Sequence, residues 1–310
     1  MSKRRLLVTG ARGFVGSILT EAADAAGFDP VGFTDPETTQ PADLRDARAV
    51  ERAITHAQPD AVIHLAAIAA PRQAKNDPHL AWQVNVMGTL HLAQAVLSHA
   101  PAARFIFAGS SEAYGAALNR DAVPIRETAA LEPMSPYGAT KAAADVMLRQ
   151  MAHDGLRATI FRPFNHTGPG QQPAYVVPAF AHQIAEIEAG RQAPVLKVGN
   201  LDACRDFLDV RDVARAYLMA AGRDDLENGE TFNLSTGTPV QIKELLAMLT
   251  GLARVPVSVE TDPDRFAPNT IPRMSGDPSL ARERLGWVPK IPLERTLADI
   301  LDRFRRQVAV

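Results

Sequence analysis

The sequence contains very little cysteine. Cys204 is the single cysteine among 310 residues, so the chain can form neither an intrachain disulfide nor a cysteine-based metal site, and we expect no bound metal. Long apolar runs are missing too, because a stretch such as residues 61–70 is far shorter than the roughly 20 residues that cross a membrane. Charge is balanced: 33 basic and 35 acidic residues give a net charge of -2. This balance argues against general nucleic-acid binding, which needs a basic face.

The N-terminus has basic residues but lacks the features of a signal peptide. The segment MSKRRLLVTG contains neither a long apolar stretch nor a small-residue cleavage site. We interpret it as the start of a buried strand and expect a cytoplasmic protein. Apolar residues make up 46% of the chain, which is enough for a sizeable core, and the length corresponds to one large domain or two ordinary ones.

Apolar and amphipathic segments alternate through the first half of the chain. Short apolar runs typical of strands separate stretches in which apolar residues have helical spacing. This alternation predicts βαβ units and a doubly wound parallel sheet of the Rossmann type, which is an α/β fold. The expected strands are 6–8, 30–34, 61–65, 104–110 and 157–163, and the expected helices are 14–26, 46–58, 79–100 and 137–153.

The second half has a different composition. Residues 164–205 are rich in proline and glycine around one clear helix, and residues 207–237 return to the strand–helix pattern. These shifts predict a Rossmann domain and a smaller C-terminal substrate-binding lobe. The domain is expected to comprise 1–165 with about 206–238, and the lobe 166–205 with 239–310.

Three glycines connect the first expected strand to the first expected helix. Gly10, Gly13 and Gly16 are three residues apart in LLVTGARGFVG. In a dinucleotide site the first glycine allows a tight turn, the second lets backbone approach the pyrophosphate, and the third lets the helix pack on the sheet. Free N–H groups at the helix start hold the phosphates. We therefore predict a dinucleotide site here, with Arg12 and Phe14 included; the alternative is a glycine-rich turn without a ligand.

The end of the second strand bears on the choice between NAD and NADP. An acidic side chain there binds the ribose 2′-hydroxyl of NAD, whereas a basic one accepts the 2′-phosphate of NADP. Asp35 lies one residue beyond the expected tip, and Arg12 in the glycine loop is a candidate partner for a 2′-phosphate. These two signals conflict, so the sequence leaves the cofactor preference open.

A tyrosine and a lysine share one face at the start of a predicted helix. Tyr137 and Lys141 are four residues apart in SPYGATKAAAD. An ammonium beside a phenol is expected to lower the pKa of the phenol from about 10, giving a proton donor and acceptor for a ketone or carbinol. Ser110 and Ser111, at the end of the fourth expected strand, offer a hydroxyl to the same oxygen.

Taken in order, these motifs resemble those of a known family. HLAA at 64–67, NVMGT at 85–89, GSSEAYG at 109–115 and RPFN at 162–165 accompany the glycine loop and the Tyr–Lys pair. The set resembles the extended short-chain dehydrogenase/reductase family, also called NAD-dependent epimerase/dehydratase, whose members act on nucleotide sugars with NAD or NADP. The resemblance covers almost the whole chain.

The resemblance implies roles for particular residues. Ser110, Tyr137 and Lys141 would form the catalytic triad, with Ser110 preferred over Ser111 because it stands four residues before Tyr114, as the family's hydroxyl does. A homodimer through the helices near 79–100 and 137–153 is also implied. The implied cofactor contacts are Gly10, Gly13, Gly16, Asp43, Leu44, Ala66, Ala67, Asn85, Tyr137, Lys141 and Pro163.

The second half supplies candidates for binding a nucleotide-diphosphate sugar. Arginine forks onto phosphate oxygens, and the family places arginines on the diphosphate at motifs that correspond to Arg205 and Arg265. Ser111, Glu112, Asn165 and His166 are further candidates at the sugar, although His166 is equally consistent with an ordinary loop residue.

Residues 164–171 and 198–213 resemble the family's reductases of GDP-linked 4-keto-6-deoxy sugars. They imply reduction of a 4-keto group by NAD(P)H with Tyr137 as the acid. A redox-neutral 4-epimerase or 4,6-dehydratase remains an alternative. Glu112 is the residue that a dehydratase would use as its base, but it also occurs in the family's reductases and does not decide between them. A non-catalytic NAD(P)-sensing protein is a remote alternative, since a sensor does not need the triad.

Overall fold

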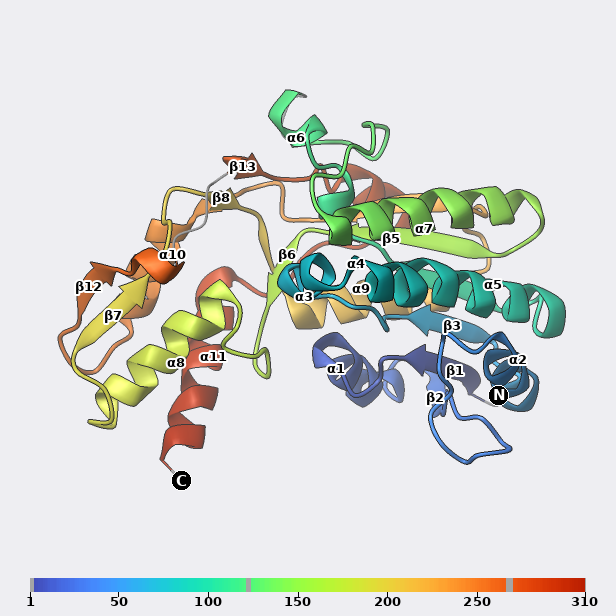
Figure 1. Cartoon of the computed structure of the whole chain (residues 1–310), viewed down its shortest axis with the longest axis horizontal. Helices are drawn as coiled ribbons and strands as arrows, with labels where there is room; N and C mark the ends of the chain where they lie inside the picture. The colour runs from blue at the N-terminus through green and yellow to red at the C-terminus, as the bar shows by residue number, and fades with distance from the viewer. Residues whose placement is uncertain (1–2, 121–123, 266–269, 310) are drawn as a thin grey trace.

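A parallel sheet forms the centre of the molecule. The computed structural model describes residues 3–120, 124–265 and 270–309. Six strands pair in parallel in the order β10-β5-β4-β3-β1-β2 (Figure 1). The predicted doubly wound α/β fold is therefore confirmed. The strands are β1 (Arg4–Thr9), β2 (Phe28–Val31), β3 (Ala61–His64), β4 (Arg104–Ala108), β5 (Ala158–Pro163) and β10 (Glu230–Leu234).

Helices cover both faces of this sheet because its strands are apolar on both sides. Leu6 and Val8 of β1 enter one core, and Leu7 between them enters the other. The first core packs on α1 (Phe14–Ala23) and α9 (Val210–Ala221). The second core packs on α2 (Ala47–Ala57), α5 (Gly88–His99) and α7 (Pro136–His153). A strand buried on both faces reads as a continuous apolar run, which is how the sequence reveals it.

The second strand differs from its prediction. β2 covers Phe28–Val31 rather than 30–34, and the chain then turns into a loop. The Asp35 backbone N–H donates to the Gln40 carbonyl at 2.9 Å, and the Arg52 guanidinium donates to both carboxylate oxygens of Asp35 at 2.9 and 2.6 Å. These contacts hold residues 35–40 away from the sheet.

The predicted helix at 79–100 is present but interrupted. It consists of α4 (Pro78–Trp82), a π-helical turn η1 (Gln83–Met87) and α5. A π turn places one extra residue in the helix and often marks a functional site. Here it carries the buried Asn85, whose amide donates to the Ile68 carbonyl and the Thr140 hydroxyl.

A second lobe has a core of its own. α8 (Val176–Glu188), α10 (Ile242–Gly251) and α11 (Leu293–Val308) pack together with β7 (Val195–Val198), which pairs in parallel with β12 (Ser258–Thr261). The short strand β8 (Cys204–Arg205) holds the half-buried Cys204. β6 (Asn165–Thr167) and β9 (Phe207–Asp209) pair where the chain passes between the sheet and the lobe.

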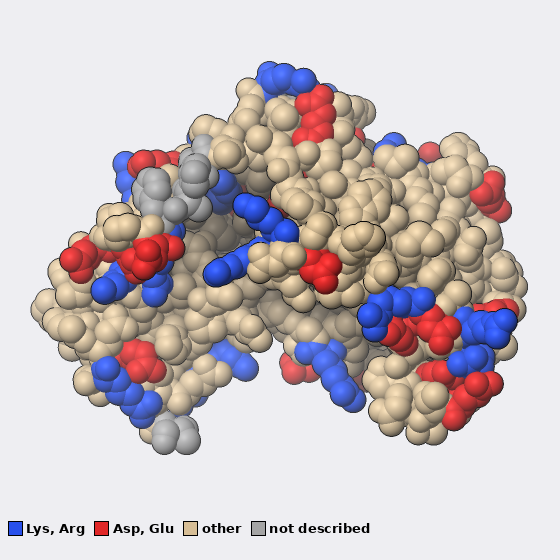
Figure 2. Space-filling view, viewed as in Figure 1, with Lys and Arg blue, Asp and Glu red and all other residues tan. Residues whose placement is uncertain are grey.

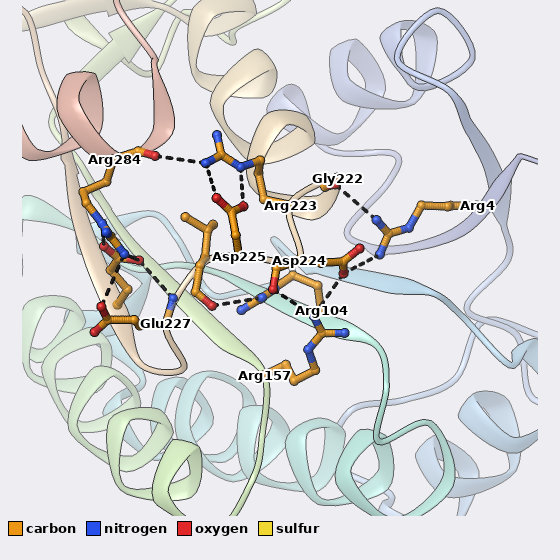
Figure 3. A network of polar contacts seen from close by, with 11 residues as sticks. Arg4, Arg104, Arg157, Gly222, Arg223, Asp224, Asp225, Glu227 and Arg284 are labelled. Carbon is orange, nitrogen blue, oxygen red and sulfur yellow. Dashed lines mark hydrogen bonds and ion pairs between the residues drawn. The ribbon is translucent and has the colours of Figure 1, made fainter.

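The amino edge of the sheet carries a network of arginines (Figure 3). Asp224 accepts hydrogen bonds from Arg4 of β1 at 3.5 Å and Arg157 before β5 at 3.0 Å. Arg104 of β4 is buried and donates from Nη2 to the Leu226 carbonyl, while its Nε and Nη1 have no partner among the described residues. Burial lowers the pKa of Arg104. This edge lies opposite the strand ends where α/β sheets bind ligands.

None of the helices within the described ranges is long and apolar enough to cross a membrane. The same ranges contain no group of three or more histidine, cysteine, aspartate or glutamate residues that could hold a metal ion.

Candidate active site

A large cleft opens at the carboxyl edge of the sheet. Its volume is about 1990 Å³, which exceeds the roughly 300–1000 Å³ of common small-molecule pockets and leaves room for two ligands. The residues at its floor directly follow β1, β3 and β4 or end β5. Figure 2 shows basic side chains gathered beside the hollow between the two halves of the molecule. Among the described residues the lining has six basic and three acidic side chains, although the whole chain carries a net charge of -2.

The glycine loop at one end of the cleft has no room for side chains. Gly10 has a φ of +73°, and a Cβ there would lie 2.9 Å from the Ala66 nitrogen. A Cβ on Gly16 would lie 2.2 Å from the Gly10 carbonyl oxygen. α1 begins directly after Gly13 without a side-chain cap, so its first N–H groups are free to face the cleft. The backbone therefore forms a cradle of the kind that holds a dinucleotide pyrophosphate.

The start of α7 places the tyrosine and the lysine in the same cleft. Ser135 caps the helix by accepting a hydrogen bond from Gly138 N–H at 3.0 Å, and Pro136 occupies the first turn. Lys141 Nζ donates to the Ala108 carbonyl at 2.7 Å and lies 6.0 Å from the centre of the Tyr137 ring. Burial lowers the pKa of Lys141 to about 8.

The pKa of the Tyr137 phenol is raised, whereas the sequence predicted that Lys141 would lower it. Burial is the largest cause, the Glu112 carboxylate adds to it, and a hydrogen bond with Ser110 acts in the opposite direction. Lys141 does not offset these effects, since its ammonium is directed to a backbone carbonyl. The phenol thus keeps its proton at neutral pH.

Ser110 and Glu112 of the GSSEAYG segment lie beside this phenol. Ser110 caps the short helix η2 (Ser111–Ala113) by accepting from Glu112 N–H at 3.1 Å. Ser111 instead contacts the Met274 sulfur at 3.6 Å. The Glu112 carboxylate accepts from the Ser135 hydroxyl at 2.9 Å, and burial raises its pKa while Arg205 lowers it. A hydroxyl, a phenol and a carboxyl therefore converge at one point of the cleft.

A sheet with a glycine cradle at one strand end and a Ser–Tyr–Lys set at another is a nucleotide-dependent redox site in outline. The family model described as GDP-mannose 4,6 dehydratase matches residues 7–300. The chain belongs to the extended short-chain dehydrogenase/reductase family. This membership confirms the resemblance that the motifs indicated.

Members of the family with known activities resemble this chain along nearly its whole length. The GDP-6-deoxy-D-mannose reductase of Pseudomonas aeruginosa is 35% identical, over 98% of this chain and 98% of the relative. The structure of RMD from Pseudomonas aeruginosa complexed with NADPH superposes with a TM-score of 0.89 at 33% identity, covering 98% of this chain and 100% of the other. The UDP-glucose 4-epimerase from Brucella ovis in complex with NAD has a TM-score of 0.83 at 27% identity, covering 97% and 98%.

Most of the predicted site residues come together in the cleft of this family member. Those that line it are Gly10, Arg12, Gly13, Phe14, Gly16, Ala66, Ala67, Ser110, Ser111, Glu112, Tyr137, Lys141, Pro163, Asn165, His166 and Arg205. Those outside its lining are Asp35, Asp43, Leu44, Asn85 and Arg265.

The residues outside the lining have other contacts. Asp35 is held by Arg52, and Asp43 forms an ion pair with Arg45 at 2.6 Å. Leu44 is buried. The Asn85 amide donates a hydrogen bond to the Thr140 hydroxyl of α7. Both Asp35 oxygens already accept a hydrogen bond from Arg52.

The two arginines predicted at the diphosphate differ in position. Arg205 lines the cleft and donates to the Cys204 and Ile271 carbonyls at 2.8 and 2.9 Å. Arg265 is exposed and pairs with Asp262 at 3.2 Å. The structure therefore brings one of them, Arg205, to the site.

His166 lines the cleft and contacts the start of α1. Its ring stacks on Phe14 of the glycine loop, with 6.3 Å between centres and 3° between planes. Its Nδ1–H donates to the Phe164 carbonyl at 3.1 Å, and burial lowers its pKa. The neutral ring therefore has Nε2 left as an acceptor.

Sequence reasoning missed several cleft residues. Arg72 of α3 (Pro71–Asn76), Tyr175 before α8, Tyr217 of α9 and Arg303 of α11 all line the cleft. None belongs to a motif, and the fold alone brings these distant segments together. An anionic ligand needs cations, which was the one usable signal in the sequence. That signal could not select Arg72 and Arg303 from the 33 basic residues.

Proposed function

We propose that this protein reduces the 4-keto group of a nucleotide-linked 4-keto-6-deoxy-hexose with NAD(P)H, and that the nucleotide is GDP. The observation that carries the proposal is the similarity over almost the full length to a GDP-6-deoxy-D-mannose reductase. The cleft supports it, because Ser110, Tyr137 and Lys141 meet there beside a glycine cradle.

The cradle fits the dinucleotide on grounds of shape and charge. Gly10 and Gly16 leave space that a Cβ would fill, and the free N–H groups of α1 favour phosphate oxygens. When bound, the nicotinamide cofactor supplies the hydride. Lys141 lines the same cleft beside the end of β4, where its ammonium can hold the cofactor.

The protein's own part in the reaction is to hold and deliver a proton. The Tyr137 phenol stays protonated because burial and Glu112 raise its pKa, so it can donate to the carbonyl oxygen as negative charge develops there. The Ser110 hydroxyl lies close enough to Tyr137 to act on its pKa, so it can orient the same oxygen. Arg205 provides the cation that the diphosphate of the substrate requires.

One experiment separates this function from the redox-neutral ones. Purified protein is mixed with NADPH or NADH and with GDP-, dTDP- or UDP-linked 4-keto-6-deoxy sugars in turn. We expect one equivalent of reduced cofactor to be consumed per 4-hydroxyl product with the GDP-linked sugar. Cofactor that stays bound through gel filtration, with turnover and no net consumption, would contradict the proposal.

Glu112 favours a second candidate, a 4,6-dehydratase. Its buried carboxyl, whose pKa is raised, lies beside Tyr137. A base that acts at carbon five of the sugar has to lie in this position. The test is the same mixture with GDP-mannose and oxidised cofactor. Formation of a 4-keto-6-deoxy sugar, lost in Glu112→Gln, would establish this activity.

A further inference from the structure

Three of the four tyrosines in this chain line the cleft: Tyr137, Tyr175 and Tyr217. The fourth, Tyr114, lies in the core, where its hydroxyl donates to Asn233 at 2.7 Å and accepts from Arg162 at 3.0 Å. The proposed reaction uses Tyr137. Tyr217 is deeply buried and has no assigned role.

The Tyr217 ring is fixed in the core beneath the cleft. The residue is 1% exposed and lies on α9, in the core that β1, α1, β4 and β5 share. It meets Phe161 of β5 edge to face, with 5.1 Å between ring centres. A helical side chain points toward the start of its helix, and α9 starts at the cleft side of the sheet directly after β9. The packing therefore directs the hydroxyl to the cleft floor.

The hydroxyl at the end of this ring has no hydrogen-bond partner in the described part of the chain. No hydrogen bond to it occurs among the described residues, whereas the core Tyr114 makes two. The polar side-chain atoms in the described ranges that are sealed from solvent and unpaired belong to Arg104 and Thr159. The Tyr217 oxygen is not one of them, so it reaches the cleft. A buried donor that opens into a binding cleft is satisfied by a ligand oxygen.

We infer that the Tyr217 hydroxyl donates a hydrogen bond to the nicotinamide half of the bound cofactor. A dinucleotide crosses the carboxyl edge of the sheet from the glycine cradle toward the catalytic residues, and Tyr217 lies under that path between β1 and β5. Burial raises the pKa of Tyr217, so the group remains a donor. The ring of Tyr217 contacts Phe161 of β5, the strand that ends at Pro163 in the cleft lining, and this places Tyr217 near the catalytic end rather than the adenosine end.

This inference rests on the nicotinamide cofactor of the family and not on the proposed sugar. Calorimetric titration of the full chain with NADPH and NADH is the test. Tyr217→Phe should weaken the binding of the preferred cofactor about 5- to 30-fold, the effect of losing one hydrogen bond. AMP, which lacks the nicotinamide half, should bind the variant and the native chain equally.

The matched control is Tyr114→Phe, which also removes a buried hydroxyl but lies outside the cleft lining. It should lower the unfolding temperature and leave the cofactor affinity unchanged. Thermal unfolding of each variant with and without cofactor gives a second readout, because the cofactor should stabilise Tyr217→Phe less than the native chain. Unchanged NADPH and NADH affinity in Tyr217→Phe, or an equal loss for AMP, would overturn the inference whatever the sugar substrate proves to be.

Discussion

Tyr137 stands in surroundings that favour its neutral form. Burial and the Glu112 carboxylate both destabilise the phenolate, so the residue enters the reaction in its protonated form. A reductase needs that form, since the carbonyl oxygen must receive a proton as the hydride arrives.

Replacing this acid tests its role directly. Tyr137→Phe keeps the ring and its packing but removes the proton donor. We expect kcat to fall about 10²- to 10⁴-fold, as is typical when a general acid is lost. Calorimetry should show the nucleotide-sugar affinity unchanged; a variant with near-normal turnover would exclude Tyr137 as the acid.

The pH dependence should report Lys141. Burial lowers the pKa of this group to about 8, so the free enzyme loses the ammonium charge at a lower pH than an exposed lysine would. The catalytic efficiency kcat/KM for the cofactor reports the free enzyme and should fall as the pH rises through about 8. In Lys141→Met the residual kcat/KM should show no decline in this range. A native profile that stays level up to pH 10 would show that the charge of Lys141 is not required.

Arg205 and Arg265 form a natural pair for comparison. Arg205→Ala should weaken nucleotide-sugar binding by about 1.5–3 kcal/mol, the scale of hydrogen bonds to charged groups, because this residue lines the cleft. Arg265→Ala removes an exposed side chain that pairs with Asp262 and should leave that affinity unchanged. The measurement is the calorimetric Kd of each variant for a GDP-sugar. Equal losses would mean that Arg265 reaches the substrate.

For single residues, the sequence predicted which side chains take part in the site better than it predicted the surroundings that set their pKa values. The spacing of Tyr137 and Lys141 indicated which residues meet, because both lie on one helix face. It could not indicate the sign of the Tyr137 pKa shift, which depends on Glu112 and on burial by other segments. Tyr217 was invisible for the same reason, since its contact with Phe161 joins residues far apart in the chain.

Among the elements, α7 and β5 are joined by a buried ion pair. Asp145 and Arg162 are 1% and 2% exposed in their side chains and meet at 2.8 Å. Arg162 also donates to Tyr114 and to the Glu127 carbonyl. The pair therefore fixes the helix that carries Tyr137 and Lys141 against the strand that ends at the cleft floor.

Removing one charge of this pair should destabilise the fold strongly. Asp145→Asn leaves the buried guanidinium without a counter-charge, at a cost of about 3–5 kcal/mol in the free energy of unfolding. Arg149→Ala is the matched control, because Arg149 also binds Asp145 but is 43% exposed, and it should cost less than about 1 kcal/mol. Urea unfolding measures both. Similar losses for the two variants would show that burial does not decide the contribution of this pair.

The elements themselves were largely predictable, and the exceptions have local causes. Alternating apolar runs indicated the parallel strands and their helices because both faces of the sheet are buried. The end of β2 was misjudged because the chain leaves the sheet after Val31, and Asp35 is then held by Arg52, a residue of the next helix. The π turn at Asn85 has no periodic signature, because the extra residue is accommodated by contacts with Ile68 and Thr140.

On the scale of the whole molecule, three elements in contact with one another each carry an exposed apolar side chain. Trp82 of α4, Met87 of η1 and Val146 of α7 are 44%, 45% and 53% exposed, and α7 contacts both of the other elements (Figure 1). We propose that this surface forms the homodimer interface expected for the helices near 79–100 and 137–153. Exposed apolar side chains on adjoining helices are consistent with such an interface.

A single charge tests this assembly. Val146→Glu should convert a dimer to a monomer, because a carboxylate in a buried apolar interface loses its hydration without gaining a partner. Val259→Glu is the matched control on β12 of the lobe, at 47% exposure, and should leave the mass unchanged. Sedimentation equilibrium measures both masses. A dimeric Val146→Glu, or a monomeric native chain, would rule out this interface.

The lone thiol gives the protein a single point for chemical labelling. Cys204 is half buried in β8, one residue from the Arg205 that faces the cleft. A thiol-reactive fluorophore would therefore attach to the lobe at one defined place, with no other cysteine to remove first. Its emission would follow the lobe during a single turnover and separate the arrival of the sugar nucleotide from the exchange of the cofactor, two events that a steady-state rate combines.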